Sequence, residues 1–281
     1  MLVVNFLIKP FNISFPIPIV PFFISLFNDL SKFLLLYIYA AFLTMASNLW
    51  NHLNDAEEDL KFGSRDPKIL LENKKFFIGL ATLLYIVTLS FTSFTVLAAV
   101  PAIFTWFYSD KIFLYKFTNF RLKEHYVTEL LTYCIVVPTA FLAMWSMCSE
   151  INFKAIYFAF MFTTVALASV VLKDIKDMTQ DSTMGYKTLA VVFDYKFLLK
   201  LSIFLSYIFY IIIFIYSFSF NILYVVSVIP LFVLIKTNLN LTKEKWTIKS
   251  EKIVNEYMYS SLLALCLLCL AATIEYLQRS L

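Results

Sequence analysis

Residues 48–59 read Asn-Leu-Trp-Asn-His-Leu-Asn-Asp-Ala-Glu-Glu-Asp and follow a long apolar run. Asn51, Asp55 and Asp59 recur every four residues, so on a helix they share one face. Carboxylates are costly beside lipid unless they face a cavity, a partner or a cation. We therefore expect a membrane helix whose polar end carries this stripe, with Glu57 and Glu58 turned away from it.

A second acidic cluster has the same character. Residues 173–181 read Lys-Asp-Ile-Lys-Asp-Met-Thr-Gln-Asp and also follow an apolar run. Asp174, Asp177 and Asp181 are three and four residues apart, so they would share a helix face. If both faces meet at one end of a bundle, their Asp residues repel one another without cations. The pattern predicts bound Mg²⁺ together with a diphosphate, which would balance that charge.

The composition is that of an integral membrane protein. Of the 281 residues, 61% are hydrophobic and only 15% are charged, and the mean hydropathy is +0.79. These values exclude a disordered chain and a soluble multidomain protein. With 31 Phe and 17 Tyr against 3 Gly, bulky aromatic side chains must fill the bundle or face lipid. We expect a lipid bilayer around the protein and no nucleic acid partner.

Apolar runs near membrane-spanning length predict nine helices. They cover residues 11–27, 33–53, 76–92, 94–109, 126–147, 154–173, 197–217, 219–236 and 253–275. The stretch from Phe76 to Tyr108 is too long for one span and is interpreted as two helices joined by a tight turn. The predicted fold class is therefore all-α, a polytopic membrane bundle of nine transmembrane helices that forms a single domain over residues 1–281.

The positive charges agree with this count. With the N-terminus inside, Lys9 and the loops after helices two, four, six and eight, together with the adjoining helix ends, hold 20 of the 23 Lys and Arg residues. Only Lys32, Lys154 and Arg279 fall on the other side. Such a bias follows the positive-inside rule. We expect a multi-pass protein of the cell membrane, with its N-terminus and both acidic clusters on the cytoplasmic side.

Basic residues flank both clusters and are candidate phosphate ligands. Arg can bind a phosphate through two donors, and Lys acts as a point charge. Carboxylate and amide oxygens suit Mg²⁺, which keeps waters and shares its shell with phosphate oxygens. The basic residues are Lys61, Arg65 and Lys68 after the first cluster, Arg121 and Lys123 after helix four, and Lys187 after the second cluster.

A diphosphate site at the mouth of an aromatic-rich membrane bundle implies a diphosphate carried on a lipid. Mg²⁺ would neutralise the leaving diphosphate as the carbon–oxygen bond breaks. An allylic tail would leave a delocalised cation, which the faces of Phe and Tyr can stabilise. The same aromatic side chains would exclude water, which otherwise quenches that cation.

The two motifs resemble those of the UbiA superfamily of intramembrane prenyltransferases. That family has nine transmembrane helices, with an Asn-Asp-x2-Asp-x3-Asp motif after helix two and an Asp-x2-Asp-x3-Asp motif after helix six. The matching residues are Asn51, Asp55 and Asp59 in the first motif and Asp174, Asp177 and Asp181 in the second. Weaker similarities are Lys9-Pro10-Phe11-Asn12, Tyr108-Ser109, Arg121-Leu122-Lys123 and the stretch Gly185-Tyr186-Lys187-Thr188-Leu189.

The resemblance implies a role for each matched residue. Mg²⁺ on the diphosphate would be held by Asp55, Asp59, Asp174 and Asp177, with Asn51 and Asp181 alongside. Phosphate oxygens would be bound by Arg65, Arg121, Lys123 and Lys187. Asn12 would face the central cavity from helix one, and Tyr108 would sit near the reacting centre.

Three features depart from the family pattern or extend it. His52 stands where the family usually has the Asp after Asn, and is either a ligand or a helix-surface residue. The usual Arg-Pro-Leu-x-x-Gly is replaced by Arg-Asp-Pro-Lys-Ile-Leu at residues 65–70, which bears on the acceptor more than on the chemistry. Glu129 begins helix five, where it either orients or deprotonates an acceptor or caps the helix.

Other classes fit less well. CDP-alcohol phosphotransferases need an Asp-Gly-x2-Ala-Arg run, which is absent. Transporters place ion sites in broken helices near the bilayer centre, whereas these acids cluster at helix ends. The predicted reaction is Mg²⁺-dependent transfer of a polyprenyl group from its diphosphate to a lipophilic acceptor. We weakly prefer an aromatic quinone precursor, with a prenylglyceryl phosphate of ether lipids as the alternative.

Overall fold

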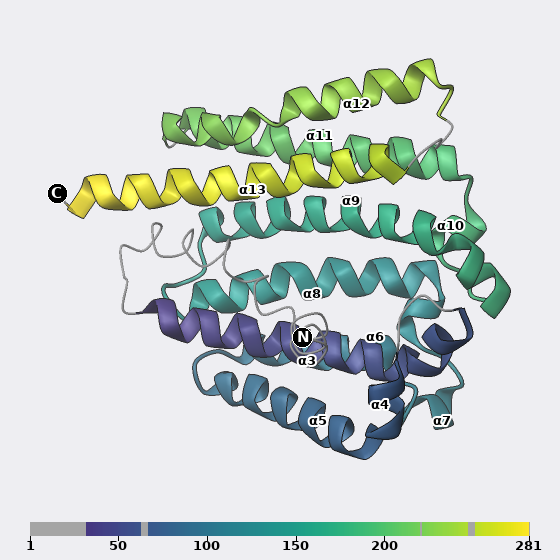
Figure 1. The fold of residues 1–281 in the computed structure, drawn as a ribbon. Coiled ribbons are helices and arrows are strands. Elements are labelled where there is room, and N and C mark those ends of the chain that lie inside the picture. The colour runs from purple at the N-terminus through teal and green to yellow at the C-terminus, as the bar shows by residue number, and fades with distance from the viewer. Residues whose placement is uncertain (1–31, 63–66, 220, 247–250, 281) are drawn as a thin grey trace. The chain divides into compact units, whose positions relative to one another are not determined.

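The computed structural model describes residues 32–62, 67–219, 221–246 and 251–280, and every regular element in these ranges is helical. Figure 1 shows long helices joined by short helical turns. The elements are α3 (Phe33–Phe62), α4 (Lys68–Glu72), α5 (Lys74–Ser90), η2 (Phe91–Ser93), η3 (Val96–Ala98), α6 (Ala99–Ser109), α7 (Tyr115–Thr118), η4 (Leu122–Glu124), α8 (Tyr126–Ser146), α9 (Phe153–Met184), α10 (Leu189–Val192), α11 (Tyr195–Ser219), η5 (Ile222–Val228), α12 (Leu231–Lys243) and α13 (Glu251–Ser280). The prediction of an all-α membrane protein is confirmed for this part of the chain.

Six helical segments of the described chain are long and apolar enough to cross a membrane. They are Leu34–Phe62, Lys74–Ser93, Tyr126–Ser146, Phe153–Met184, Tyr195–Phe218 and Ile222–Lys243. Two shorter apolar helices, Val96–Ser109 and Tyr259–Glu275, coincide with two more of the predicted spans. The predicted first span, residues 11–27, lies outside the described residues, so the count of nine stays a prediction.

Two helices extend well beyond their predicted ends. α3 was expected to end at residue 53 and α9 at residue 173, but they continue to Phe62 and Met184. The added turns are the acidic motifs themselves. Their carboxylates therefore stand on regular helix, where spacings of three and four residues put side chains on neighbouring positions of one face.

The chain divides into two compact units, one with Leu34–Asn152 and the other with Phe153–Leu281. Each acidic motif belongs to a different unit. The expected single domain over residues 1–281 stays a prediction.

Aromatic side chains fill the first unit where α3, α5 and α6 meet. Trp50 is fully buried and its Nε1 donates to the Trp106 carbonyl at 3.0 Å. The ring centroids of Trp50 and Trp106 are 4.4 Å apart, and those of Tyr85 and Trp106 are 5.0 Å apart. Burying such large rings supplies much of the packing that a chain with few small residues needs. This packing fixes the register of α3 against α6, one residue before the stripe begins at Asn51.

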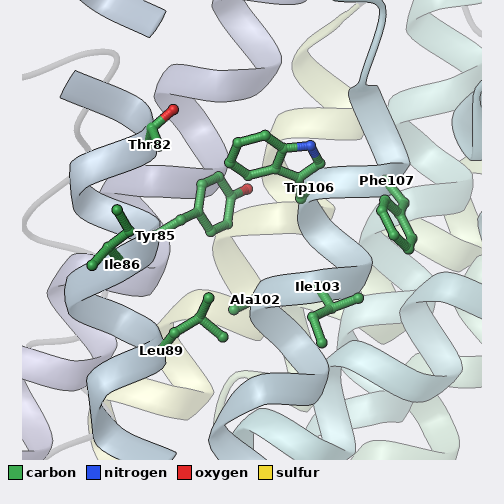
Figure 2. A pocket seen from close by; sticks show the side chains of 8 residues that line it. All are labelled: Thr82, Tyr85, Ile86, Leu89, Ala102, Ile103, Trp106 and Phe107. Carbon is green, nitrogen blue, oxygen red and sulfur yellow. The ribbon is translucent and has the colours of Figure 1, made fainter. Parts of the chain in front are cut away.

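An apolar groove of about 230 Å³ lies between α5 and α6 (Figure 2). Its lining residues are Thr82, Tyr85, Ile86, Leu89, Ala102, Ile103, Trp106 and Phe107. None of these side chains is charged, so the groove suits hydrocarbon and not a diphosphate.

In the second unit, side-chain hydrogen bonds join helices that are distant in sequence. The Ser202 hydroxyl of α11 donates to the Ala168 carbonyl of α9 at 2.7 Å. The Tyr210 hydroxyl donates to the Ser260 carbonyl of α13 at 3.0 Å. The Tyr224 hydroxyl of η5 donates to Glu275 Oε2 of α13 at 2.6 Å. Such bonds stabilise helix contacts in an apolar environment, because a polar group that faces lipid has no hydrogen-bond partner there.

Tyr224→Phe should destabilise the second unit. Tyr224 is fully buried and Glu275 nearly so, and the variant removes a donor from a buried carboxyl group. We expect the free energy of unfolding to fall by about 1–3 kcal/mol, measured by denaturant titration of the purified protein in micelles. Tyr259→Phe is the control, since Tyr259 lies on α13 with a relative exposure of 66%. Equal midpoints for the two variants would contradict a stabilising role for the hydrogen bond.

Candidate functional site

The first polar cluster forms where α3, the end of α6, η4 and the start of α8 meet in the first unit. The loop after α6 is shaped by Asp110, whose carboxylate accepts backbone N–H bonds from Ile112, Phe113 and Leu114 at 3.1, 3.1 and 2.6 Å. The amide oxygen of Asn54 accepts the Lys111 backbone N–H at 2.7 Å. These bonds hold the loop against α3 and present its basic side chains to the stripe.

Two members of the predicted stripe share one lysine. Lys123 Nζ donates to the amide oxygen of Asn51 at 3.3 Å and forms a salt bridge with Asp55. The Ser109 hydroxyl also donates to the Asn51 amide oxygen. Asp59 lies one turn further along α3 and is half-buried. The structure thus places Lys123 against the stripe, while its predicted role as a phosphate ligand stays a prediction.

Arg121 is the most buried charge of this cluster, with a side chain that is 0% exposed. Its Nη1 donates to Asp55 at 3.1 Å, its Nη2 to Glu58 at 2.9 Å and its Nε to Glu124 at 2.6 Å. A planar guanidinium suits this arrangement because its donors point in fixed directions. The phosphate role of Arg121 stays a prediction, since here its guanidinium contacts three carboxylates.

The expectation for the two glutamates of the first motif is half wrong. Glu57 does turn away, and its exposed carboxylate pairs with Lys74 at 3.2 Å. Glu58, by contrast, is only 5% exposed and binds Lys111 at 3.0 Å in addition to Arg121. Three residues after Asp55, it lies only about 60° around the helix from that residue, close enough to share its guanidinium.

Three residues of the first cluster were not assigned to the site from the sequence, namely Glu58, Lys111 and Glu124. Glu124 has a recognisable signal, because it lies three residues after Arg121 and accepts that residue's backbone N–H at 3.2 Å as well. This is the glutamate half of a capping box at the start of η4, while the Glu124 N–H donates to the Arg121 backbone carbonyl. Glu58 and Lys111 carry no such local signal, since their partnership joins positions 53 residues apart.

The second cluster is stabilised by backbone groups. α9 ends with Gly185 at φ +76°, while the Tyr186 N–H bonds to the Asp181 carbonyl and the Gly185 N–H to the Ser182 carbonyl. This is a Schellman ending, in which glycine tolerates the left-handed backbone. It turns the chain back along α9 at the start of the Gly185-Tyr-Lys-Thr-Leu stretch.

The returning chain then contacts the acidic face of α9. The Thr188 hydroxyl donates to Asp181 Oδ2 at 2.8 Å, and the Leu189 backbone N–H donates to Asp174 Oδ2 at 3.1 Å. Asp174 is buried, Asp177 is half-buried and Lys187 is exposed. Asp174 and Asp181 therefore accept hydrogen bonds from the loop that carries Lys187.

The remaining predicted residues have varied positions. Lys61 and Lys68 are exposed and His52 is half-buried. Asn12 and Arg65 lie outside the described residues. Tyr108 donates to Glu129 Oε1 at 2.6 Å, and its ring centroid is 5.8 Å from that of Tyr133. Glu129 is 1% exposed at the start of α8, and the hydrogen bond from Tyr108 is its described contact.

The donor chemistry of both clusters fits Mg²⁺. Within the described ranges, no group of three or more His, Cys, Asp and Glu residues is placed to hold a metal ion without other ligands. Mg²⁺ binding therefore stays a prediction, in which one or two carboxylates would share the ion with waters and substrate phosphates. Asp55 and Asp59 on α3, and Asp174 and Asp177 on α9, supply such carboxylates.

The fold and these clusters define a helical membrane protein with acidic helix ends bordered by lysine and arginine. The sequence matches the UbiA prenyltransferase family over residues 25–263. The chain belongs to this family and is a membrane prenyltransferase. A prenyl diphosphate donor and a lipophilic acceptor follow from that membership.

Two comparisons extend this finding. The chain is 34% identical over 207 residues to an uncharacterised protein of Archaeoglobus fulgidus. The aligned part covers 70% of this chain and 71% of that protein. It also resembles the solved structure of a digeranylgeranylglyceryl phosphate synthase, with a TM-score of 0.67 and 18% identity. That likeness covers 98% of this chain and 100% of the other, and at this identity it shows a shared fold.

Arg121→Lys should destabilise the first unit despite keeping the charge. A lysine cannot reach three carboxylates in the directions that the guanidinium reaches, so buried acids lose partners. We expect the free energy of unfolding to fall by about 3–5 kcal/mol, measured by denaturant titration in micelles. Lys116→Arg on exposed α7 is the reverse exchange and should change nothing. Parent-like stability of Arg121→Lys would show that the three contacts carry little energy.

Proposed function

We propose that the enzyme transfers a polyprenyl group from polyprenyl diphosphate to the free hydroxyl of a prenylglyceryl phosphate, with Mg²⁺ and release of diphosphate. The observation that carries the choice of acceptor is the fold shared with a digeranylgeranylglyceryl phosphate synthase along nearly the whole chain. This acceptor replaces the aromatic ring that the sequence weakly favoured. We further propose that the reaction occurs on the cytoplasmic side of the cell membrane.

The proposed diphosphate site draws on both acidic motifs. Asp55, Asp59, Asp174 and Asp177 hold the metal, with Asn51 and Asp181 beside them. Lys123, Arg121, Arg65 and Lys187 bind phosphate oxygens, and Asn12 lines the cavity. In support, Lys123 already bridges Asn51 and Asp55, and Lys187 is carried by the loop that contacts Asp174 and Asp181.

The chemistry follows from charge. Bound Mg²⁺ supplies Lewis-acid stabilisation of the diphosphate that leaves. The allylic carbon–oxygen bond of the donor breaks, and its electron pair leaves with the diphosphate. The acceptor hydroxyl oxygen forms the new carbon–oxygen bond, and its proton passes to the departing diphosphate. Lys123 offsets negative charge that develops on the leaving group, and Tyr108, near the reacting carbon, presents an aromatic ring.

A phosphorylated acceptor also suits the basic residues of the chain. Donor and acceptor together bring two anionic groups to one enzyme, so the site needs more cations than one diphosphate does. Lys61 and Lys68 are exposed beyond the end of the first motif. Their positive charges would favour a second phosphate.

An aromatic acceptor is the second candidate, favoured by one observation. Glu129 is buried at the start of α8 and accepts a hydrogen bond from Tyr108 at 2.6 Å. A carboxylate beside a tyrosine near the reacting centre is placed to orient or deprotonate a phenolic substrate. The choice between the two acceptors is open to direct assay.

Incubation of membranes with labelled geranylgeranyl diphosphate and Mg²⁺ should give a labelled product with geranylgeranylglyceryl phosphate. A panel with 4-hydroxybenzoate and other aromatic acids should give little product. Chromatography of the extracted lipids measures both. Membranes without the expressed enzyme are the control. Product with the aromatic acids alone would replace the glycerol-phosphate proposal by the aromatic one.

Asp55→Ala and Asp174→Ala should each reduce turnover by at least about 100-fold. Each removes a proposed ligand of the Mg²⁺ that neutralises negative charge developing on the diphosphate in the transition state. Rates are measured at saturating donor and Mg²⁺, alongside folding by size-exclusion chromatography. Glu72→Ala, at an exposed position of α4, is the matched control and should retain activity. Full activity in both Asp variants would remove the metal role of the two motifs.

A further inference from the structure

Within the first unit, the described ion pairs around Arg121 link six charged side chains. The three acids are Asp55, Glu58 and Glu124, and the three bases are Lys111, Arg121 and Lys123. The formal charges sum to zero. Glu58 is the most buried of the acids, at 5% exposure.

We propose that Glu58 is a positioning residue for the cation site of the prenyl transfer proposed above, on which this inference rests. By sharing Arg121 with Asp55 and by binding Lys111, Glu58 offsets part of the positive charge that these two bases bring near Asp55. The Asp55 carboxylate then keeps enough negative charge to attract a divalent cation. Glu58 itself touches neither the metal nor the substrate.

The geometry supports this role. Asp55 and Glu58 occupy the two terminal nitrogens of the same guanidinium, at 3.1 and 2.9 Å. If Glu58 were neutral, Arg121 and Lys111 would face one negative charge fewer, and the network would carry a net positive charge beside Asp55. Charges a few ångströms apart with little water between them interact strongly. The added positive charge would therefore weaken the binding of a divalent cation.

A substitution at Lys111 should change the affinity for the cation in the opposite direction. Its ammonium contacts Glu58 at 3.0 Å, and its side chain is 32% exposed. Replacing it by a neutral residue leaves the network with a net negative charge. A cation near Asp55 would then be favoured, though less strongly because water screens this lysine. Structural damage from either substitution would instead weaken binding in both cases, so the sign separates the two explanations.

The test measures Mn²⁺ binding to the purified full-length enzyme in micelles with inorganic diphosphate present, by the electron paramagnetic resonance signal of free Mn²⁺. Glu58→Gln should raise the Mn²⁺ dissociation constant about 10- to 100-fold, and Glu58→Asp should recover part of that loss because the charge remains. Lys111→Met should lower the constant by about threefold. Glu57→Gln, the adjacent exposed glutamate, should leave it unchanged.

The same variants give a kinetic readout. In Glu58→Gln the Mg²⁺ concentration for half-maximal rate should rise by a similar factor, while kcat at saturating Mg²⁺ stays within a few-fold of the parent. Parent-like Mn²⁺ binding in Glu58→Gln, or weakened binding in Lys111→Met, would overturn the inference. Asp55→Asn separates the two proposals, because unchanged Mn²⁺ binding in that variant would refute the metal role of Asp55 itself.

Discussion

A buried guanidinium needs carboxylates, and this requirement organises the polar end of the first unit. Removing an arginine from water costs several kcal/mol, which is offset only by close, well-oriented anions. Arg121 has three, from Asp55 and Glu58 on α3 and from Glu124 on η4. The loop after α6 must therefore stay against α3. With it come Ser109, Lys111 and Lys123, which contact Asn51, Glu58 and Asp55.

The second unit presents its acids by different means. Asp174 and Asp181 accept hydrogen bonds from Leu189 and Thr188, and the turn at Gly185 makes these contacts possible. Neutral donors orient a carboxylate without cancelling its charge, whereas a salt bridge does both. The two motifs are similar in spacing but differ in their described contacts. In the first, Asp55 binds arginine and lysine, while in the second Asp174 and Asp181 accept bonds from a backbone N–H and a hydroxyl.

Much of the fold and part of the site could be predicted from sequence, for a physical reason. Membrane helices can be recognised by their length and hydropathy. A spacing of four residues places Asn51 and Asp55 on one face of α3, whatever that helix packs against. Glu58 could not be assigned in this way. Helical geometry puts it between the stripe and the exposed Glu57, and only the distant Arg121 and Lys111 draw it inward. The same holds for the ends of α3 and α9, which continue as helix because the polar motifs find partners there.

Lys123 shows how one cation can serve both the resting and the working enzyme. It lies between Asn51 and Asp55, two residues proposed to face the diphosphate, and so occupies a place where positive charge is favoured. A divalent cation arriving with its diphosphate would take over the carboxylate, and Lys123 could turn to the phosphate oxygens by rotation of its flexible stem. Arg121, whose side chain is fully buried and held by Glu58 and Glu124, would have to bind phosphate oxygens without leaving these partners. The lysine is therefore the residue suited to move with the substrate, and the arginine the one suited to stay.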